Sequence, residues 1–300
     1  MQRCLHSDKY LRMLAMPDPV MILKEINIGF VGGGNMAQAI AFGLLKKKCV
    51  NPENIWISSR TEETLNKWKE FDNNIHTTLN NADVIENCEY IFLAVKPHIL
   101  VDALKTCVPH GKDKLPQKLF ISVLVGTTLE VLNKELKILN ENPSVIRSMP
   151  NTPLMVSEGI TVYCCSNTSK EDEIIVKLLF SILGLCQDIP ESLMNSVGGL
   201  SGSGPAYAYM IIEALADGAV RKGVPRALAN KCAAQVLVGA GRMVLETGKH
   251  PGQLKDAVCS PSGSTITGIH EMERGGVRAS MMNAVEAAVG RSDELTNSKK

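Results

Sequence analysis

A glycine-rich turn constrains this chain more than any other feature of its sequence. The segment Gly32-Gly-Gly34 directly follows the apolar run 26–31 and leads, through Ala37, into a helix-forming stretch. In the pattern G-x-G-x-x-A, the first glycine permits a tight turn and the second lets the backbone approach a pyrophosphate, while the helix N-terminus supplies N–H donors. The sequence predicts a dinucleotide-binding turn, and a glycine turn with a purely structural role is the alternative. The residues that we expect to contact the dinucleotide here are Gly32, Gly34, Asn35 and Met36.

Short apolar runs alternate with helix-forming segments in the first half of the chain. The expected strands are residues 26–31, 54–58, 90–95, 119–123 and 145–147. The expected helices between them are residues 35–48, 62–70, 80–87, 98–107 and 128–137. A further strand, helix and strand are expected at 160–165, 169–183 and 185–189. This alternation is typical of βαβ units, so we expect an α/β Rossmann-type doubly wound parallel sheet.

After about residue 190 the chain is rich in Ala, Gly and Leu and has no strand-like run. Helices are expected there at residues 204–222, 226–247, 251–258, 264–273 and 277–297. We therefore expect a dinucleotide-binding Rossmann domain at 24–190 and an all-α domain at 191–300. Residues 1–23 carry three methionines and mixed charges, and we expect them to be a disordered leader, with an import signal as the alternative.

The segment 205–220 is apolar on nearly every side. A helix that is apolar all round must be buried all round, and the rest of the helical half offers it little cover. We therefore expect a homo-oligomer in which the all-α domain is the dimerisation domain.

The end of the second expected strand, Ser58-Ser59-Arg60, indicates which dinucleotide is bound. An NAD site normally carries Asp or Glu there to bind the ribose hydroxyls. Hydroxyls and a guanidinium instead suit a 2′-phosphate, which a carboxylate would repel. We expect Ser59 and Arg60 to bind NADPH, with NADH also possible. An Arg60 that simply lies in solvent is the alternative.

A third group of residues, Ala94-Val-Lys-Pro97, follows the strand at 90–95. The carboxyl ends of strands form the edge that carries the ligand in open α/β sheets. We expect Ala94, Val95, Lys96 and Pro97 to flank the cofactor, and an ordinary exposed lysine is the alternative reading of Lys96.

Composition excludes several classes of protein. The net charge of +1 and the aromatic content of 4% argue against a nucleic-acid partner. The nine cysteines are scattered without a C-x-x-C pair, so no metal site is expected. We expect these cysteines to be reduced thiols. The sequence has no apolar run of about 18 residues, so no membrane span is expected. We expect a cytoplasmic location, with mitochondria as the alternative.

Two loops in the second half carry more glycine and serine than a connector needs, at residues 198–206 and 260–266. The second opens a helix, where free backbone N–H groups join the hydroxyls of Ser260, Ser264 and Thr265. Such a cluster has the right size for one carboxylate, whereas ordinary helix capping accounts for only one hydroxyl.

The chain resembles the pyrroline-5-carboxylate reductase family, whose members carry out the last step of proline biosynthesis. Six motifs in family order, spanning about residues 24–296, carry the resemblance. They are GFVGGGNMA at 29–37, AVKP at 94–97, RSMPNTP at 147–153, LSGSGPAY at 200–207, HPGQLKD at 250–256 and SPSGSTI at 260–266.

The resemblance implies a Rossmann domain and a helical domain that interleaves with its partner's in a homodimer, and dimers that commonly assemble into decamers. It implies that the substrate carboxylate sits on the loop from Ser260 to Thr265, Gly263 and Ser264 included, with the Thr265 hydroxyl beside the imine nitrogen as the catalytic group. Asn81 falls where the family contacts the adenosine part of the cofactor. Two departures are Ala257, where relatives carry Asn, and Gly33, where Ala is common. The first puts one polar contact near the substrate in doubt.

Reduction of the cyclic imine to L-proline needs a hydride, a held carboxylate and a proton on nitrogen. Such an imine is basic enough to arrive protonated, so Thr265 need only position it or relay a proton. His250 and His270 are alternative acids.

Two other functions stay open. A β-hydroxyacid dehydrogenase has a similar layout but needs a lysine base, for which Lys222, Lys231 and Lys255 are the nearby candidates. A non-catalytic nucleotide-binding scaffold would need no carboxylate site. The sequence does not fix the oligomer size, the feedback inhibition by proline, or a glutamate rather than an ornithine route.

Overall fold

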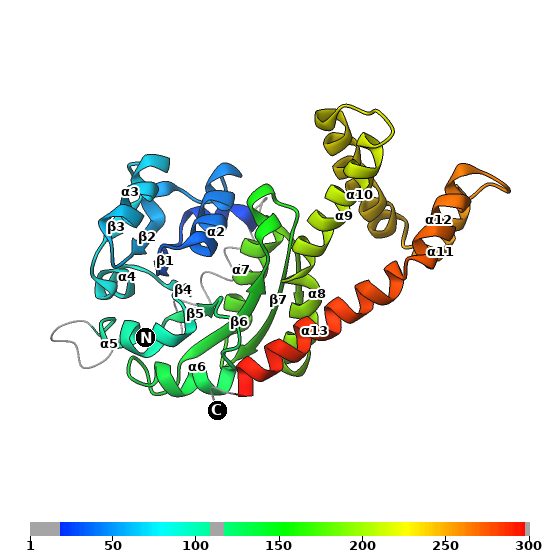
Figure 1. Ribbon diagram of the computed structural model, residues 1–300. Helices are drawn as coiled ribbons and strands as arrows, with labels where there is room; N and C mark the ends of the chain where they lie inside the picture. The colour runs from blue at the N-terminus through cyan, green and yellow to red at the C-terminus, as the bar shows by residue number, and fades with distance from the viewer. Residues whose placement is uncertain (1–18, 109–116, 298–300) are drawn as a thin grey trace. The chain divides into compact units, whose positions relative to one another are not determined.

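The structure is a computed structural model that describes residues 19–108 and 117–297. The chain forms two compact units (Figure 1). The first contains the described residues up to Gly202 together with those from Arg291 onward, and the second contains Ser203–Gly290. The domain limits expected from the sequence, 24–190 and 191–300, stay predictions.

Within the described residues, the first unit is built on one eight-stranded sheet in the order β3-β2-β1-β4-β5-β6-β7-β8. Every neighbouring pair is parallel except β6 and β7. The first six strands follow the order of a doubly wound dinucleotide-binding sheet, which confirms the predicted α/β Rossmann-type fold. The strands are β1 (Ile28–Val31), β2 (Ile55–Ser58), β3 (His76–Thr78), β4 (Tyr90–Leu93), β5 (Leu119–Ser122), β6 (Ser144–Pro150), β7 (Gly159–Ser166) and β8 (Gly184–Asp188).

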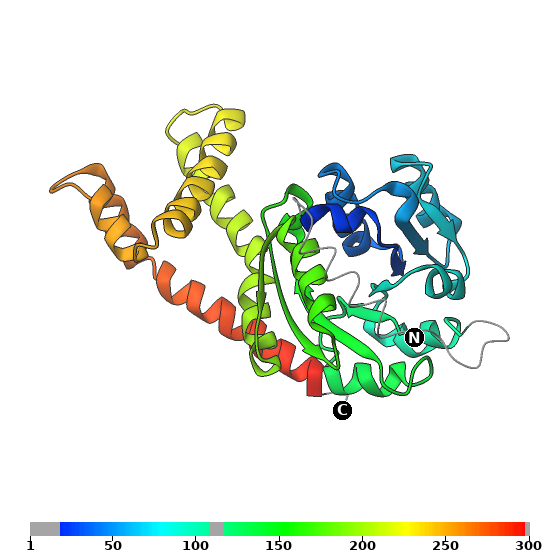
Figure 2. The same cartoon turned by 180° about the vertical axis from the view of Figure 1, so that it is seen from behind.

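Helices cover both faces of this sheet (Figure 2). Buried side chains of η1, α2, α3 and α7 pack on one face, and those of α4, α5 and α6 pack on the other. Strands β1 and β4 are therefore buried along their whole lengths, which explains their continuous apolar sequences. The helices of this unit are η1 (Pro19–Lys24), α2 (Asn35–Lys46), η2 (Pro52–Asn54), α3 (Glu62–Phe71), α4 (Asn81–Asn87), η3 (Pro97–Ile99), α5 (Leu100–Lys105), α6 (Leu129–Leu136), η4 (Thr152–Val156), α7 (Lys170–Ser181), η5 (Glu191–Leu193) and α8 (Met194–Ser201).

The register of the central strands brings three segments to one edge of the sheet. Val31, the last residue of β1, lies opposite Ser58 of β2 and Leu93 of β4. The three strands therefore end together, and the segments that follow them begin side by side. These are the three segments in which the sequence predicts dinucleotide contacts.

The structure corrects the sequence predictions at both ends of the first unit. Residues 19–23 were expected in the disordered leader, but they form most of η1, because Ile22 and Leu23 are buried in the core. Residues 1–18 of that leader lie outside the described residues. At the other end, β7 runs antiparallel to β6, whereas a parallel sheet was expected.

One strand and one α-helix of the first unit were not predicted from the sequence. Strand β3 has only three residues, His-Thr-Thr, and its polar side chains give no apolar signal. Helix α8 covers residues 198–201 of the glycine-rich segment 198–206, which was expected to be a loop. Gly198 packs closely inside this helix: an added Cβ would lie 2.2 Å from the sulfur of Met149, whose side chain would have to move. Close packing therefore accounts for a glycine that reads as a loop signal.

The second unit consists of helices, with α9 packed on α10 through the buried Ala216, Ala229 and Ala233. These helices expose large apolar side chains, among them Met210 at 61% and Leu245 at 77%. Apolar surface of this kind needs cover, in line with the expectation that α9 is buried by another subunit. None of the helices in the described ranges is both long and apolar enough to cross a membrane. The helices are α9 (Gly204–Val220), α10 (Arg226–Thr247), α11 (Pro251–Val258), α12 (Ser264–Arg274) and α13 (Val277–Asn297).

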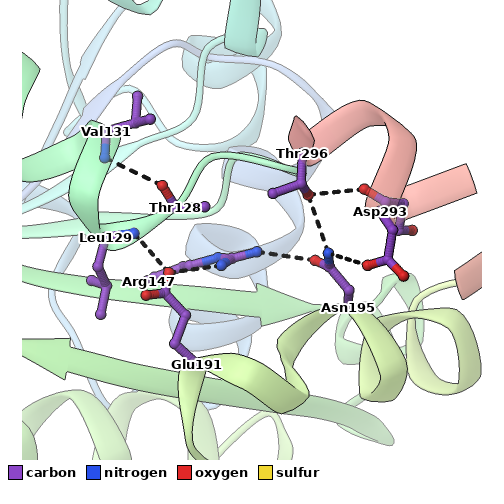
Figure 3. Close-up of polar contacts among 9 residues, drawn as sticks. Thr128, Leu129, Val131, Arg147, Glu191, Asn195, Asp293 and Thr296 are labelled. Atoms are coloured by element: carbon purple, nitrogen blue, oxygen red, sulfur yellow. Dashed lines mark hydrogen bonds and ion pairs between the residues drawn. The ribbon is translucent and has the colours of Figure 1, made fainter. Parts of the chain in front are cut away.

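A polar chain anchors the end of α13 within the first unit (Figure 3). Arg147 on β6 has a side chain only 3% exposed, and its guanidinium pairs with Glu191 at 2.8 Å. Its second terminal nitrogen donates to the side-chain oxygen of Asn195 at 3.3 Å. The Asn195 amide in turn donates to Asp293 at 2.8 Å and to the Thr296 hydroxyl at 3.1 Å. Asn195 thus connects the buried arginine to the end of α13.

Glu191 has a second partner. The same carboxylate oxygen that binds Arg147 accepts the backbone N–H of Leu129 at 2.7 Å, at the first residue of α6. A carboxylate at a helix N-terminus is favourable because of the helix dipole. The pair therefore joins β6, α6 and η5 at one point.

Replacing Asn195 with leucine should loosen the end of α13, because the side chain keeps its size but loses both donor and acceptor. We expect the free energy of unfolding to fall by about 1–3 kcal/mol. Amide exchange should accelerate in residues 291–296, as measured by mass spectrometry. The control is Asn66→Leu, an exposed position on α3, which should stay within about 0.5 kcal/mol of the parent. Unchanged exchange in 291–296 would contradict this account of the anchor.

Candidate active site

The turn between β1 and α2 is built around a glycine that no other residue can replace without strain. Gly32 has a φ of +103°, which L side chains rarely adopt. An added Cβ would also lie 2.8 Å from the carbonyl carbon and oxygen of Ala94 and 2.9 Å from the nitrogen of Val95. The Gly32 N–H donates to the carbonyl of Ser58 at 3.0 Å, and the Ala94 N–H donates to that of Val31 at 2.9 Å. The ends of β1, β2 and β4 are therefore in direct contact.

The N-terminus of α2 leaves its first donors open. Gly34 is the N-cap and no side chain caps it. The first N–H to bond within the helix is that of Gln38, which donates to the Gly34 carbonyl at 3.0 Å. The N–H groups of the first turn thus have no acceptor inside the helix, and an anion can take them. A Cβ at Gly34 would meet nothing within 4 Å, so the space in front of the turn suits an approaching pyrophosphate.

The residues expected to bind the 2′-phosphate, Ser59 and Arg60, follow β2 directly. Ser59 is half-buried, and its backbone N–H donates to the carbonyl of Thr78 on β3 at 3.2 Å. Arg60 is exposed, and it forms no ion pair with any described residue. A serine whose backbone is held by β3 thus stands next to an exposed guanidinium that could bind a phosphate.

Lys96 and Asn81, two further candidates, differ in whether their side chains already form hydrogen bonds. Lys96 is exposed and forms the N-cap of η3, which Pro97 opens. The Asn81 amide instead donates to the Thr106 hydroxyl at 2.8 Å and to the Ala103 carbonyl at 3.3 Å, which ties the start of α4 to α5. A contact between Asn81 and the adenosine would therefore fall to its side-chain oxygen.

Asn35 and Met36, the remaining candidates on α2, line a cavity of about 420 Å³ between this helix and η4. The far wall of the cavity includes Thr152 and Met155. The RSMPNTP motif at 147–153 thus runs from β6 to a cavity wall beside the N-terminal turn of α2.

The expected substrate loop belongs to the second unit and again ends at an open helix N-terminus. Gly263 is the N-cap of α12 and offers no side chain to cap it. Its N–H donates to the Ser260 carbonyl at 3.1 Å, and its carbonyl accepts the N–H of Thr267 at 3.4 Å. The N–H groups of Ser264 and Thr265 therefore have no acceptor inside the helix. A Cβ on Gly263 would lie 2.4 Å from the Ser260 hydroxyl oxygen, so glycine keeps the loop compact.

The rival acids and bases have other roles or unfavourable surroundings. His250 is the N-cap of α11, where its Nδ1 accepts the N–H of Gly252 at 3.1 Å. His270 is exposed on α12. The hydrogen bond from Lys255 to Asp256, together with the charge of that carboxylate, raises the pKa of the lysine, whereas a general base needs a lowered one. In residues 19–108 and 117–297, no three His, Cys, Asp or Glu side chains form a group that could hold a metal.

Two residues that the sequence does not predict contact the glycine turn. Trp68 on α3 and Gln38 on α2 both donate to the carbonyl of Gly33. Trp68 lies 35 residues away from Gly33. No local pattern connects positions so far apart, so only the fold reveals this pair.

Comparisons with known proteins agree with both halves of this arrangement. A family model described as NADP oxidoreductase, coenzyme F420-dependent, matches residues 27–126. A second, described as pyrroline-5-carboxylate reductase dimerisation, matches residues 191–295. Among solved structures, that of Plasmodium falciparum pyrroline carboxylate reductase with NADP bound superposes with a TM-score of 0.79, at 29% identity over 91% of this chain and 99% of that one. The Coxiella burnetii pyrroline-5-carboxylate reductase reaches 0.78, at 34% identity over 90% and 98%.

Full-length relatives are more similar in sequence. Pyrroline-5-carboxylate reductase 3 of Xenopus laevis is 42% identical over 272 residues, which cover 90% of this chain and 96% of the relative. Pyrroline-5-carboxylate reductase of Glycine max is 42% identical over 275 residues, which cover 91% and 97%. Identity at this level across nearly the whole length of both proteins leaves one assignment: the chain belongs to the pyrroline-5-carboxylate reductase family.

Proposed function

We propose that this protein reduces 1-pyrroline-5-carboxylate to L-proline with NADPH. The observation that carries the proposal is that this one chain of the family has two helix N-termini without a capping side chain. The N-terminus of α2 opens from a glycine turn that fits a pyrophosphate. That of α12 opens from a serine-rich loop that fits a carboxylate.

The cofactor residues proposed are those that follow β1, β2 and β4. The open donors of α2 bind the pyrophosphate, and Ser59 and Arg60 bind the 2′-phosphate. Ala94 to Pro97 border the same edge, and the Asn81 oxygen is the proposed adenosine contact. The Plasmodium falciparum relative with NADP bound supports this choice of cofactor. When bound, NADPH supplies the hydride.

The substrate residues proposed are Ser260, Gly263, Ser264 and Thr265. The N–H groups at the start of α12 hold the substrate carboxylate, where the helix dipole favours negative charge. The Thr265 hydroxyl orients the ring nitrogen, which is basic enough to carry its own proton. The chain therefore contributes position more than acid catalysis.

The assembly proposed is a homodimer through the helical unit, with a decamer as the larger form. The exposed apolar side chains of α9 and α10 support it, as does the match to a dimerisation family model. We expect the protein in the cytoplasm, with mitochondria as the alternative.

The proposed reaction is tested by mixing purified protein with pyrroline-5-carboxylate and following the absorbance of reduced nicotinamide. We expect oxidation of NADPH, slower oxidation of NADH, and proline as the product by chromatography. If the protein instead oxidises a hydroxyacid with NAD and does not reduce the imine, the result would favour the dehydrogenase. Binding of NADPH without any oxidation would favour the scaffold.

Replacing Thr265 with valine removes the hydroxyl and keeps the shape. Loss of a positioned group of this kind should lower kcat by roughly tenfold to a hundredfold, while the Kd of NADPH stays unchanged. The matched control is Thr267→Val on the same helix, since that hydroxyl only bonds back to the Gly263 carbonyl. Equal losses in both variants would contradict a specific role for Thr265.

Replacing Arg60 with alanine should weaken the binding of NADPH but not that of NADH, because only NADPH carries the 2′-phosphate. A lost charge-assisted hydrogen bond should raise the KM for NADPH by about tenfold or more. Lys69→Ala, an exposed lysine on α3, controls for the loss of a positive charge nearby. A parallel loss with both cofactors would show that Arg60 does not distinguish them.

A further inference from the structure

The carbonyl of Gly33 is held by two side-chain donors from two different helices. The indole Nε1 of Trp68 donates to it at 3.1 Å, and the amide Nε2 of Gln38 donates to it at 2.9 Å. Trp68 is fully buried, and Gly33 is buried as well. One hydrogen bond is enough to satisfy a buried carbonyl. The second donor therefore mainly fixes the direction in which the carbonyl points.

The direction of this carbonyl determines the direction of the next N–H. In a trans peptide the C=O of one residue and the N–H of the next point in opposite directions, and no cis peptide occurs among the described residues. Because the Gly33 carbonyl is held toward α3, the N–H of Gly34 faces away from it. Gly34 is the N-cap of α2 and is exposed, with open space in front of it.

We propose that Trp68 and Gln38 are positioning residues that aim the Gly33–Gly34 peptide at the cofactor pyrophosphate. They act through one carbonyl, and Gln38 also lines the cavity beside Asn35 and Met36. The inference rests on the proposed binding of NADPH but not on the reaction that follows.

The packing around Trp68 supports this role. Its ring lies 5.8 Å from that of Phe30 on β1 and 5.0 Å from that of Phe42 on α2, so the indole cannot turn away easily. A Cβ at Gly33 would lie 3.0 Å from the Trp68 Nε1 and 3.0 Å from Thr64. The indole therefore fills the space that a side chain at position 33 would take, and glycine there makes the hydrogen bond accessible.

The position of Trp68 in the sequence adds a second consequence. It lies on α3, the helix that follows Ser59 and Arg60. One helix thus follows the proposed 2′-phosphate site and, through Trp68, holds the peptide that precedes the proposed pyrophosphate site. The two sites can be tested separately, because adenosine 2′-monophosphate carries the first phosphate and lacks the pyrophosphate.

The test uses Trp68→Phe, Gln38→Met and the double variant of the full-length protein. Each single variant keeps one donor on the carbonyl, so we expect the Kd of NADPH to rise by about threefold or less. The double variant leaves the carbonyl without either donor, and we expect the Kd to rise by more than about tenfold, which exceeds the product of the single effects. Calorimetric titration measures all four proteins, the parent included. The Kd of adenosine 2′-monophosphate should change by less than about twofold in every variant, since its phosphate does not reach the turn.

Two controls separate positioning from damage. Phe71→Leu disturbs the same aromatic cluster, through the stacked pair Phe42–Phe71, but removes no bond to Gly33, so it should leave the Kd of NADPH unchanged. If the double variant fails to fold, 3-benzothienylalanine at position 68 with Gln38→Met keeps the ring size and removes the N–H. That protein should show the same selective loss.

Equal weakening of NADPH and adenosine 2′-monophosphate in the double variant would overturn the proposal, because it would indicate displacement of α3. A double variant that binds NADPH as tightly as the parent would overturn it as well. A parent protein that binds NADPH but reduces no imine would contradict only the proposed reaction, and the comparison of Kd values would still decide this inference.

Discussion

The contact between Gly32 and the start of the β4–η3 segment is the constraint on which the rest of the structure depends. The backbone of Ala94 and Val95 comes so close to Gly32 that no Cβ fits between them. This close approach is possible because β1, β2 and β4 end in register at one edge of the sheet. It places the N-terminus of α2 beside the segments that follow β2 and β4. The proposed dinucleotide site therefore depends first on the strand register and only then on its side chains.

The two proposed binding sites use the same physical device at two helices. Both α2 and α12 begin at a glycine N-cap without a capping side chain, so their first N–H groups have no partner within the helix. An anion that accepts these hydrogen bonds also gains from the helix dipole. The device suits a reaction in which both the cofactor phosphates and the substrate carboxylate are anions. It asks little of acidic or basic side chains, in agreement with a substrate that carries its own proton.

The sequence was sufficient for the fold class, the glycine turn and the family, because each depends on local pattern. The apolar runs of β1 and β4 and the G-x-G-x-x-A turn are read directly from neighbouring residues. It failed where tertiary contacts decide. Polar β3 forms because β2 offers it an edge, and Ile22 and Leu23 are ordered because the core buries them. Gly198 lies inside a helix and packs against Met149, a residue far from it in the sequence. Trp68 was missed for the same reason, since it lies 35 residues from Gly33.

The central claim is that this protein transfers a hydride from NADPH to a cyclic imine. The most direct measurement is mass spectrometry of proline formed from pyrroline-5-carboxylate and NADPH that carries deuterium at both hydrogens of the reactive nicotinamide carbon. The account predicts proline that contains one deuterium atom. Unlabelled proline, or labelled cofactor that is bound and never consumed, would contradict it.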